Sequence, residues 1–258
     1  MSLLTLPEPA NWPSGRGLLQ RVTWGVAALV AAGVFTGTHR LVVGDHVGAV
    51  VFFSFLVPIV VFLAAAHLAV RGHTSLRADG GSTGTTLRAD RTFTTLVLAT
   101  CGSFVPIGIY FVVVTINGDL DLAGFRHGRV GALLLAVPAT SSAIGCLMGA
   151  WRRGGIGYVK LTPAGIEIAD IRRYESVSWT DLVAVDDHSE SKRRTLKPIV
   201  LRLRDGTEKT IDGAYLYVPN GAGLYWMVRH YWRHPEDRVE LIDDRALERL
   251  RDGQFDLT

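Results

Sequence analysis

VGAVVFFSFLVPIVVFLAAAHLAV, residues 47–70, decides the fold, because none of its 24 positions holds Asp, Glu, Lys or Arg. At a helical rise of about 1.5 Å per residue, a run of this length crosses the roughly 30 Å hydrocarbon core of a bilayer. Three other long apolar runs occur in the first 151 residues, and none occurs after them. The sequence therefore predicts a membrane-embedded half followed by a water-soluble half.

Four transmembrane helices are expected within residues 22–151, over about residues 22–43, 47–70, 92–116 and 130–151. Residues 1–21 form a cytoplasmic N-terminal segment, which contains Glu8 and three prolines and does not fit a signal peptide. Residues 71–91 hold four Arg and a centre rich in Gly, Ser and Thr. We expect this stretch to be a flexible loop between the second and third spans.

The positive charges beside the spans predict the orientation of the bundle, because cytoplasmic loops collect Lys and Arg. Eight Arg lie on the side of the two termini and three on the other side. The eight are Arg16, Arg21, Arg71, Arg77, Arg88, Arg91, Arg152 and Arg153, and the three are Arg40, Arg126 and Arg129. We therefore expect a multi-pass protein of the plasma (inner) membrane with both termini in the cytoplasm.

Small residues recur at four-residue spacing inside two of the spans. They are Gly33 and Gly37 in the first span, and Ser141, Gly145 and Gly149 in the fourth. Such residues let helix backbones approach closely in lipid. We expect them to pack the helices of one chain together, with association into a homo-oligomer as the alternative use.

Three spans contain a proline near their middle, where it removes one backbone hydrogen bond and predicts a kink. These residues are Pro58, Pro106 and Pro138. Kinked spans also occur in transporters, so a small transporter or channel subunit is one alternative function. A water-accessible path lined by His67, Thr100 or Thr115 would favour it.

The charges are divided unequally between the two halves. Residues 1–150 carry nine basic and six acidic side chains, whereas residues 151–258 carry eighteen of each. The net charge of +3 therefore belongs to the membrane half. A nucleic-acid-binding protein would place a basic excess on its soluble part, so nucleic acid is not an expected partner.

The soluble half switches to an apolar period of two, which is typical of half-buried antiparallel strands. Val159 and Leu161, for example, alternate with polar or aromatic neighbours. Turn signals separate the strands, at residues 162–165 (TPAG) and at Asp205 and Gly206. We expect six or seven short strands up to about Tyr217.

One amphipathic helix is expected to follow the strands, with Asn220 as its N-cap and Pro235 beyond its end. Four apolar residues share one face of this helix at helical spacing: Leu224, Met227, Val228 and Tyr231. Residues 242–258 form a C-terminal tail, with a short helix expected around residues 245–251 and Asp244 as its cap.

Four stretches of the soluble half resemble the bacterial PH-like (pleckstrin-homology-like) domains of small membrane proteins. They are LTPAGIEI at 161–168, SWTDLVAV at 178–185, LRLRDGTEKTI at 201–211 and HPEDRVEL at 234–241. The resemblance covers about residues 155–241 and implies an all-β barrel capped by one α-helix. It also implies a cytoplasmic binding or scaffold module without a catalytic set. Lipid-binding PH domains that grip phosphoinositides have Lys and Arg in the first hairpin loop, and residues 162–165 lack them, so specific recognition of those lipids is not expected.

A basic loop, residues 188–197, is the candidate contact with a membrane or a partner. Its cations are Lys192, Arg193, Arg194 and Lys197. Beneath an anionic leaflet each would contribute about 1 kcal/mol. A solvated hairpin tip explains the same charges without a binding role.

Several His and Asp residues fall in the two loops on the other side of the bundle. They are His39, Asp45, His46, Asp119, Asp121 and His127. His and carboxylate side chains are acceptable zinc ligands. These residues follow no metal-binding spacing, however, and polar residues are expected at a membrane surface, so no metal site is assigned. A membrane enzyme working at these loops is a further alternative.

The search for nucleophile, phosphate-binding and dinucleotide motifs finds none, so neither an enzyme activity nor a cofactor is expected. The leading hypothesis is an integral membrane scaffold or assembly protein. Its cytoplasmic PH-like domain would bind a membrane or cytoplasmic protein partner, or the surface of the lipid bilayer itself.

Overall fold

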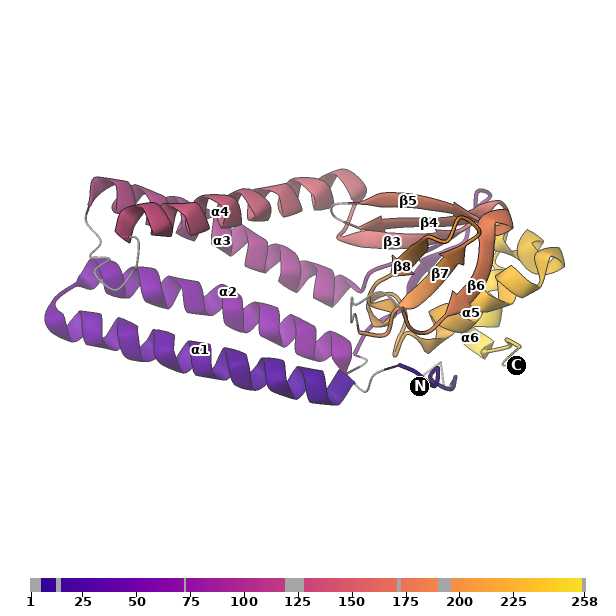
Figure 1. Ribbon diagram of the computed structural model, residues 1–258, viewed down its shortest axis with the longest axis horizontal. Helices are drawn as coiled ribbons and strands as arrows, with labels where there is room; N and C mark the ends of the chain where they lie inside the picture. Colours follow the sequence, from indigo (N-terminus) through magenta and orange to yellow (C-terminus); the bar gives the residue numbers. More distant parts are fainter. Residues whose placement is uncertain are drawn as a thin grey trace. The chain divides into compact units, whose positions relative to one another are not determined.

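The computed structural model of the chain describes residues 6–12, 15–71, 73–118, 128–170, 173–189 and 196–256 (Figure 1). The chain forms two compact units. The β-rich unit comprises residues 1–16, 68–94 and 153–258, and the helical unit comprises residues 17–67 and 95–152. The chain therefore passes between the two units four times.

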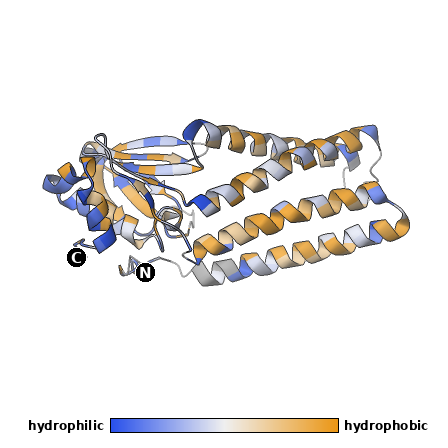
Figure 2. Ribbon diagram, turned by 180° about the vertical axis from the view of Figure 1, so that it is seen from behind, coloured by the Kyte–Doolittle hydropathy of each residue, from blue (hydrophilic) through white to orange (hydrophobic). Residues whose placement is uncertain are grey.

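Four long helices account for the apolar runs: α1 (Gly15–Val43), α2 (His46–Val70), α3 (Arg91–Asn117) and α4 (Gly128–Arg153). All four are long and apolar enough to cross a membrane, which confirms the predicted spans to within a few residues at most ends. Figure 2 shows the hydrophobic colour along these helices. At most 22% of any of their apolar windows is buried, so most apolar side chains face outward, as lipid-facing side chains do.

Close approach of α1 and α2 depends on the two glycines of the first span. A Cβ atom at Gly33 would lie 2.7 Å from the side chain of Leu56, and one at Gly37 would lie 2.9 Å from the ring of Phe53. These glycines therefore pack helices of the same chain, as predicted. In the fourth span, a Cβ atom at Gly145 would meet nothing within 4 Å. The close approach of α3 and α4 instead uses Gly108, which faces Thr140.

All eight described strands belong to the β-rich unit and form two antiparallel sheets. The first sheet has the order β1-β2-β3-β4-β5, and the second has the order β6-β7-β8. Their bounds are β1 Arg77–Asp79, β2 Thr85–Arg88, β3 Gly157–Leu161, β4 Gly165–Asp170, β5 Tyr174–Ser178, β6 Leu182–Asp186, β7 Ile199–Leu203 and β8 Glu208–Ile211. Six strands follow residue 156, as predicted. Among the described residues, no ladder of backbone hydrogen bonds closes the two sheets into one barrel.

The expectation of a flexible loop at residues 71–91 is wrong. This stretch forms the hairpin of β1 and β2, and β2 pairs with β3, so that Leu87 lies opposite Val159. Leu87 is fully buried, and the buried hydroxyl of Thr85 donates a hydrogen bond to the carbonyl of Leu241. The two strands have only three and four residues, and their stability comes from pairing with β3, 70 residues away, which no local pattern reveals.

Asp90 connects this hairpin to the start of α3. Its Oδ1 accepts the backbone N–H of Phe93 at 2.8 Å, which caps the helix. Its Oδ2 accepts the backbone N–H and the hydroxyl of Ser75, at 2.9 and 2.7 Å. Burial would raise the pKa of the Asp90 carboxyl, but these hydrogen bonds outweigh it and lower the pKa below its ordinary value. The carboxylate therefore stays ionised while 98% of the residue is hidden from solvent.

The turn predictions are confirmed. The backbones of Thr162 and Gly165 exchange two hydrogen bonds, which close the hairpin of β3 and β4. Asp205 accepts from the backbone and the hydroxyl of Thr207, and Gly206 takes φ = 81° in the turn between β7 and β8. Residues with short polar side chains and glycine therefore fix the register of both hairpins.

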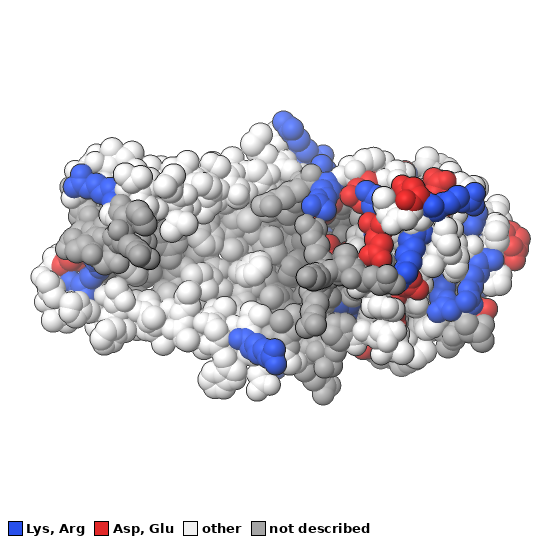
Figure 3. Space-filling view, in the orientation of Figure 1, with Lys and Arg blue, Asp and Glu red and all other residues white. Residues whose placement is uncertain are grey.

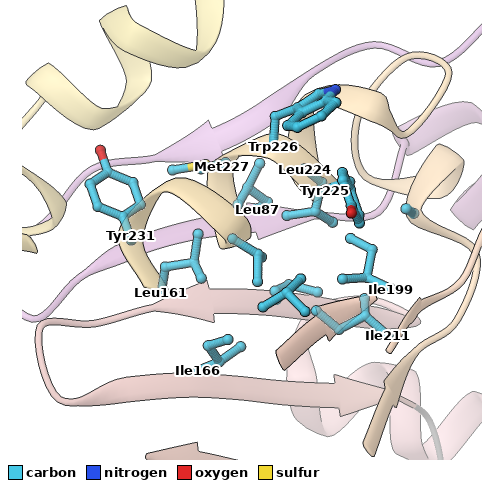
Figure 4. Close-up of a cluster of buried hydrophobic side chains, with 14 of the residues drawn as sticks. Leu87, Leu161, Ile166, Ile199, Ile211, Leu224, Tyr225, Trp226, Met227 and Tyr231 are labelled. Carbon is cyan, nitrogen blue, oxygen red and sulfur yellow. The ribbon is translucent and has the colours of Figure 1, made fainter. Parts of the chain in front are cut away.

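Helix α5 (Ala222–Arg233) covers the core of the β-rich unit, and it is followed by the 3-10 helix η3 (Pro235–Ile242) and by α6 (Arg245–Asp252). The four residues of the predicted apolar face are all fully buried, and Figure 4 shows three of them, Leu224, Met227 and Tyr231, among strand residues. The N-cap is Gly221 rather than Asn220. Asp244 precedes α6 as predicted but makes no side-chain cap, and Leu250 of α6 is fully buried.

We expect Leu87→Ala to lower the free energy of unfolding of the β-rich unit by about 2–5 kcal/mol, because it leaves a cavity in the core. Denaturant titration of the full chain in detergent, followed by tryptophan fluorescence, measures this, since four of the six Trp lie in the β-rich unit. The control is Thr83→Ala, at an exposed turn position. Equal stability of the two variants would contradict the placement of β2 in the core.

Candidate functional site

The described residues of the N-terminal segment, 6–12 (LPEPANW), lie against the β-rich unit; we call them the strap. The strap has no helix or strand structure. Only Pro9 and Trp12 are buried, and every hydrogen-bond partner described below is at least 170 residues away in sequence. The groups that contact it define the strap groove: Asp187, Lys197, Pro198, Asn220, Tyr225 and Trp226.

Trp12 anchors one end of the strap. It is 7% exposed, and its indole Nε1 donates a hydrogen bond of 2.9 Å to the carbonyl of Pro198. Its ring meets that of Tyr225 edge to face, with 6.0 Å between the centroids. Because an indole ring buries a large apolar area and also satisfies its one polar atom here, this contact fixes the position of the segment just before α1.

Trp226 binds the other end of the strap through the backbone. Its Nε1 donates a hydrogen bond of 2.8 Å to the carbonyl of Pro7. Proline has no backbone N–H, so the carbonyls near Pro7 and Pro9 are the main-chain groups available for recognition. Aromatic grooves that bind proline-containing segments use this chemistry, with rings against the prolines and a side-chain donor on a carbonyl.

Lys197 supplies the positive charge of the groove. Its ammonium lies 2.7 Å from Oε1 of Glu8, 3.0 Å from the carbonyl oxygen of Asn220 and 5.7 Å from the ring centroid of Trp12. Lys197 is only 8% exposed and takes a positive φ of 49°, which is uncommon outside glycine. A buried ammonium needs such partners, because it has lost its hydration.

This position corrects the expectation that Lys197 is part of an exposed basic loop. It is turned into the β-rich unit and holds the strap, whereas Lys192, Arg193 and Arg194 lie outside the described residues. Proximity in sequence to the other cations suggested a shared surface. The burial of Lys197 depends on Glu8, which is 189 residues away.

Asp187 binds the strap through two hydrogen bonds from Asn11. Its Oδ2 accepts the backbone N–H at 3.0 Å, and its Oδ1 accepts the side-chain amide at 3.1 Å. Oδ1 also lies 2.9 Å from Nδ1 of His188. Burial would raise the pKa of Asp187, but the bonds from His188 and Asn11 outweigh it and lower the pKa below its ordinary value. The groove thus presents a fixed negative charge to a peptide N–H.

Five polar contacts hold this extended segment: two through its main chain and three through its side chains. Sequence reasoning missed the strap groove entirely. One signal was present, namely a tryptophan and two prolines in a short polar segment, where an exposed indole would be unfavourable. The groove itself comes from residues spread over positions 187–226, and no local motif marks them.

Of the described members of the outer His and Asp set, Asp45 has structural partners. Arg40 and Asp45 form an ion pair, and the Asp45 carboxylate also accepts the backbone N–H of Gly48 at 2.7 Å, which caps α2. Asp119, Asp121 and His127 lie outside the described residues. Over the part of the chain that the structure describes, no group of three or more His, Cys, Asp or Glu residues is placed to hold a metal ion.

The polar residues named for a transport path satisfy their hydroxyl groups within their own helices. Thr100 donates to the carbonyl of Leu96 at 2.8 Å, and Thr115 donates to that of Phe111 at 2.7 Å. Threonine at such positions in lipid commonly bonds back to the preceding turn. The third named residue, His67, lies near the end of α2 and is partly buried.

A partly buried charged network joins α5, η3 and α6. Arg249 holds Glu240 with two hydrogen bonds of 2.7 and 2.8 Å, and Tyr231 donates to the same carboxylate at 3.2 Å. His230 is 5% exposed, and its Nε2 lies 2.9 Å from Asp237. Burial, and then the positive charge of Arg249, lower the pKa of His230 although Asp237 acts the opposite way. The network binds three helices together and offers no nucleophile.

We expect the β-rich unit to lose stability as the pH falls below the ordinary His pKa of 6.5. Folding lowers the pKa of His230, so the unfolded chain binds the proton more readily, and the contribution of the neutral ring is complete only above this value. The check is the difference in unfolding free energy between wild type and His230→Gln at pH 7.5 and pH 5.5. The difference should shrink at the lower pH. A difference that grows on acidification would contradict the assignment.

Comparison of the chain with protein-family models, with curated proteins and with solved structures finds no match in any of the three. Function must therefore be argued from the residues and their geometry. On the face drawn in Figure 3, acidic and basic side chains are interleaved over the β-rich unit, which agrees with the equal charge counts of residues 151–258.

Proposed function

We propose that this chain is a multi-pass membrane scaffold or assembly protein whose β-rich unit recognises a protein partner. The observation that carries the proposal is the construction of that unit. It is assembled from the segment before α1, the segment between α2 and α3, and the segment after α4. The chain thus connects the unit to the helices at four points, as expected of a binding domain held at a membrane surface.

The pairing of these segments also supports the proposed orientation. Leu87 lies opposite Val159 in one sheet, and Trp12 donates to Pro198, so all three segments belong to one folded core. If the four helices cross the membrane, the three segments lie on the same side of it. The excess of eight Arg over three supports the proposal that this side is the cytoplasmic side of the plasma (inner) membrane.

A PH-like barrel remains our proposal for the fold type of residues 155–241. Three strands of the first sheet, three strands of the second and then α5 follow in the order that the resemblance implies. The hairpin of β1 and β2 adds to the free edge of β3. The edge strands of that sheet are then β1 and β5.

The groove chemistry favours a protein partner over the lipid surface. Lys197, the one described cation of the basic loop, is committed to Glu8 and Asn220, so it is not available to lipid headgroups. A small transporter or channel subunit is the alternative function. The hydroxyls of Thr100 and Thr115 already donate to their own helices, which supports recognition rather than a polar path.

Site-specific photo-crosslinking in intact cells tests the proposal. A photoreactive amino acid is placed at Tyr174, Val183 or Val239, which are 52–58% exposed on the β-rich unit. The matched controls are Leu134 and Leu135 of α4, which are 69–70% exposed. We expect a discrete protein adduct from at least one β-rich position and no such adduct from α4. Protein adducts from α4 alone would show that the helices, not the β-rich unit, are the recognition element.

A further inference from the structure

We propose that the strap groove is a binding site for an extended, proline-containing acidic peptide of a partner protein, and that the strap occupies it as an intramolecular competitor. This inference rests on the proposed recognition function and specifies the chemistry of the partner. The strap shows which ligand the groove fits, because it is the ligand present.

The strap is held at its two ends: Trp12 belongs to the buried core cluster and Leu6 packs against it, whereas the residues between them lie mainly at the surface. Only Pro9 and Trp12, three residues apart, are buried. Pro7, Glu8, Ala10 and Asn11 are exposed, although three of them contribute a hydrogen bond or an ion pair. Two buried anchors with exposed residues between them are the usual pattern of a short peptide on a preformed groove.

The groove reads main-chain atoms that any extended peptide carries. Trp226 donates to the Pro7 carbonyl, and Asp187 accepts the Asn11 N–H. These two contacts set the direction and the register of the peptide. Neither contact involves a peptide side chain. A partner segment can therefore differ from the strap at the exposed positions that no other contact uses.

Charge sets the side-chain requirement. Without the strap, the ammonium of Lys197 would keep only the carbonyl of Asn220 as a hydrogen-bond partner described here. A buried charge without a counter-charge is unfavourable, so the groove selects a ligand that brings a carboxylate. In the strap this carboxylate belongs to Glu8, directly before the buried Pro9. The indole of Trp12 follows three residues after Pro9. The preferred pattern is therefore acidic–Pro–x–x–aromatic.

A partner peptide can displace the strap only if its local concentration and affinity outweigh those of the tethered strap. The strap is tethered to α1, which begins at Gly15, and a short tether corresponds to an effective concentration of the order of millimolar. A free peptide with the same contacts therefore competes poorly with the wild-type strap. A partner held at the same membrane has a raised local concentration of its own, which is the condition for displacement.

The test uses the full chain in detergent micelles and a fluorescein-labelled synthetic peptide LPEPANW. The strap is released by the double variant Glu8→Ala, Trp12→Ala. We expect the released chain to bind the peptide at least tenfold more tightly than wild type does. A scrambled peptide of the same composition controls for partition into detergent, and a peptide with Ala in place of Trp should bind at least tenfold more weakly.

A matched variant of the groove isolates one contact. Trp226→Phe, added to the released chain, keeps an aromatic ring but removes the N–H that bonds to Pro7. We expect roughly fivefold weaker peptide binding, the size of one lost hydrogen bond. An unchanged affinity would overturn the assignment of this contact to peptide recognition.

A released chain that still unfolds cooperatively in denaturant but does not bind the peptide would overturn the proposal. Where the double variant fails to fold, the single variant Glu8→Ala replaces it, because this exposed residue supplies the strap carboxylate that pairs with Lys197. Peptide binding no tighter than wild type would then overturn the proposal. Dimerisation of wild type that is abolished by Trp12→Ala would assign the groove to a second copy instead. None of these results alters the crosslinking test, so the two proposals fail separately.

Discussion

The pairing of β2 with β3 is the contact on which the β-rich unit depends. It joins a hairpin from between two apolar helices to a sheet that begins 70 residues later, with Leu87 opposite Val159. Leu87 is fully buried, and Asp90, which follows β2 closely in the chain, caps α3. The chain between α2 and α3 is therefore a structural part of the core. The start of α3 is joined to this segment by the hydrogen bonds of Asp90 with Phe93 and Ser75.

Lys197 and its partners form the second constraint. A buried ammonium must find counter-charge and hydrogen-bond acceptors, and here Glu8 and Asn220 provide them. The Lys197 side chain is 10% exposed and that of Glu8 is 51% exposed, and the exposed strap residues contribute little apolar burial. Specificity therefore comes from charge and main-chain contacts, and the two buried anchors, Pro9 and Trp12, add the apolar part.

The helical unit follows a different physical rule. Most of its apolar side chains face outward, and its helices approach where glycine removes a side chain, as Gly33 does against Leu56. Its threonines bond to their own helices. Because apolar burial gives no driving force in lipid, packing of small residues is the means by which such helices associate. The two units thus use opposite distributions of apolar residues.

The sequence by itself determined every feature that depends on neighbours along the chain. Length and hydropathy fixed the four apolar helices; alternation and turn residues fixed the six strands after residue 156, and helical spacing fixed the buried face of α5. Tertiary structure alone decided that residues 77–88 join the sheet, that Lys197 is buried and that residues 6–12 fill a groove. These features rest on contacts between residues about 70 to 220 positions apart. The sequence around a three-residue strand, a lysine or a pair of prolines does not indicate which distant residues it will contact.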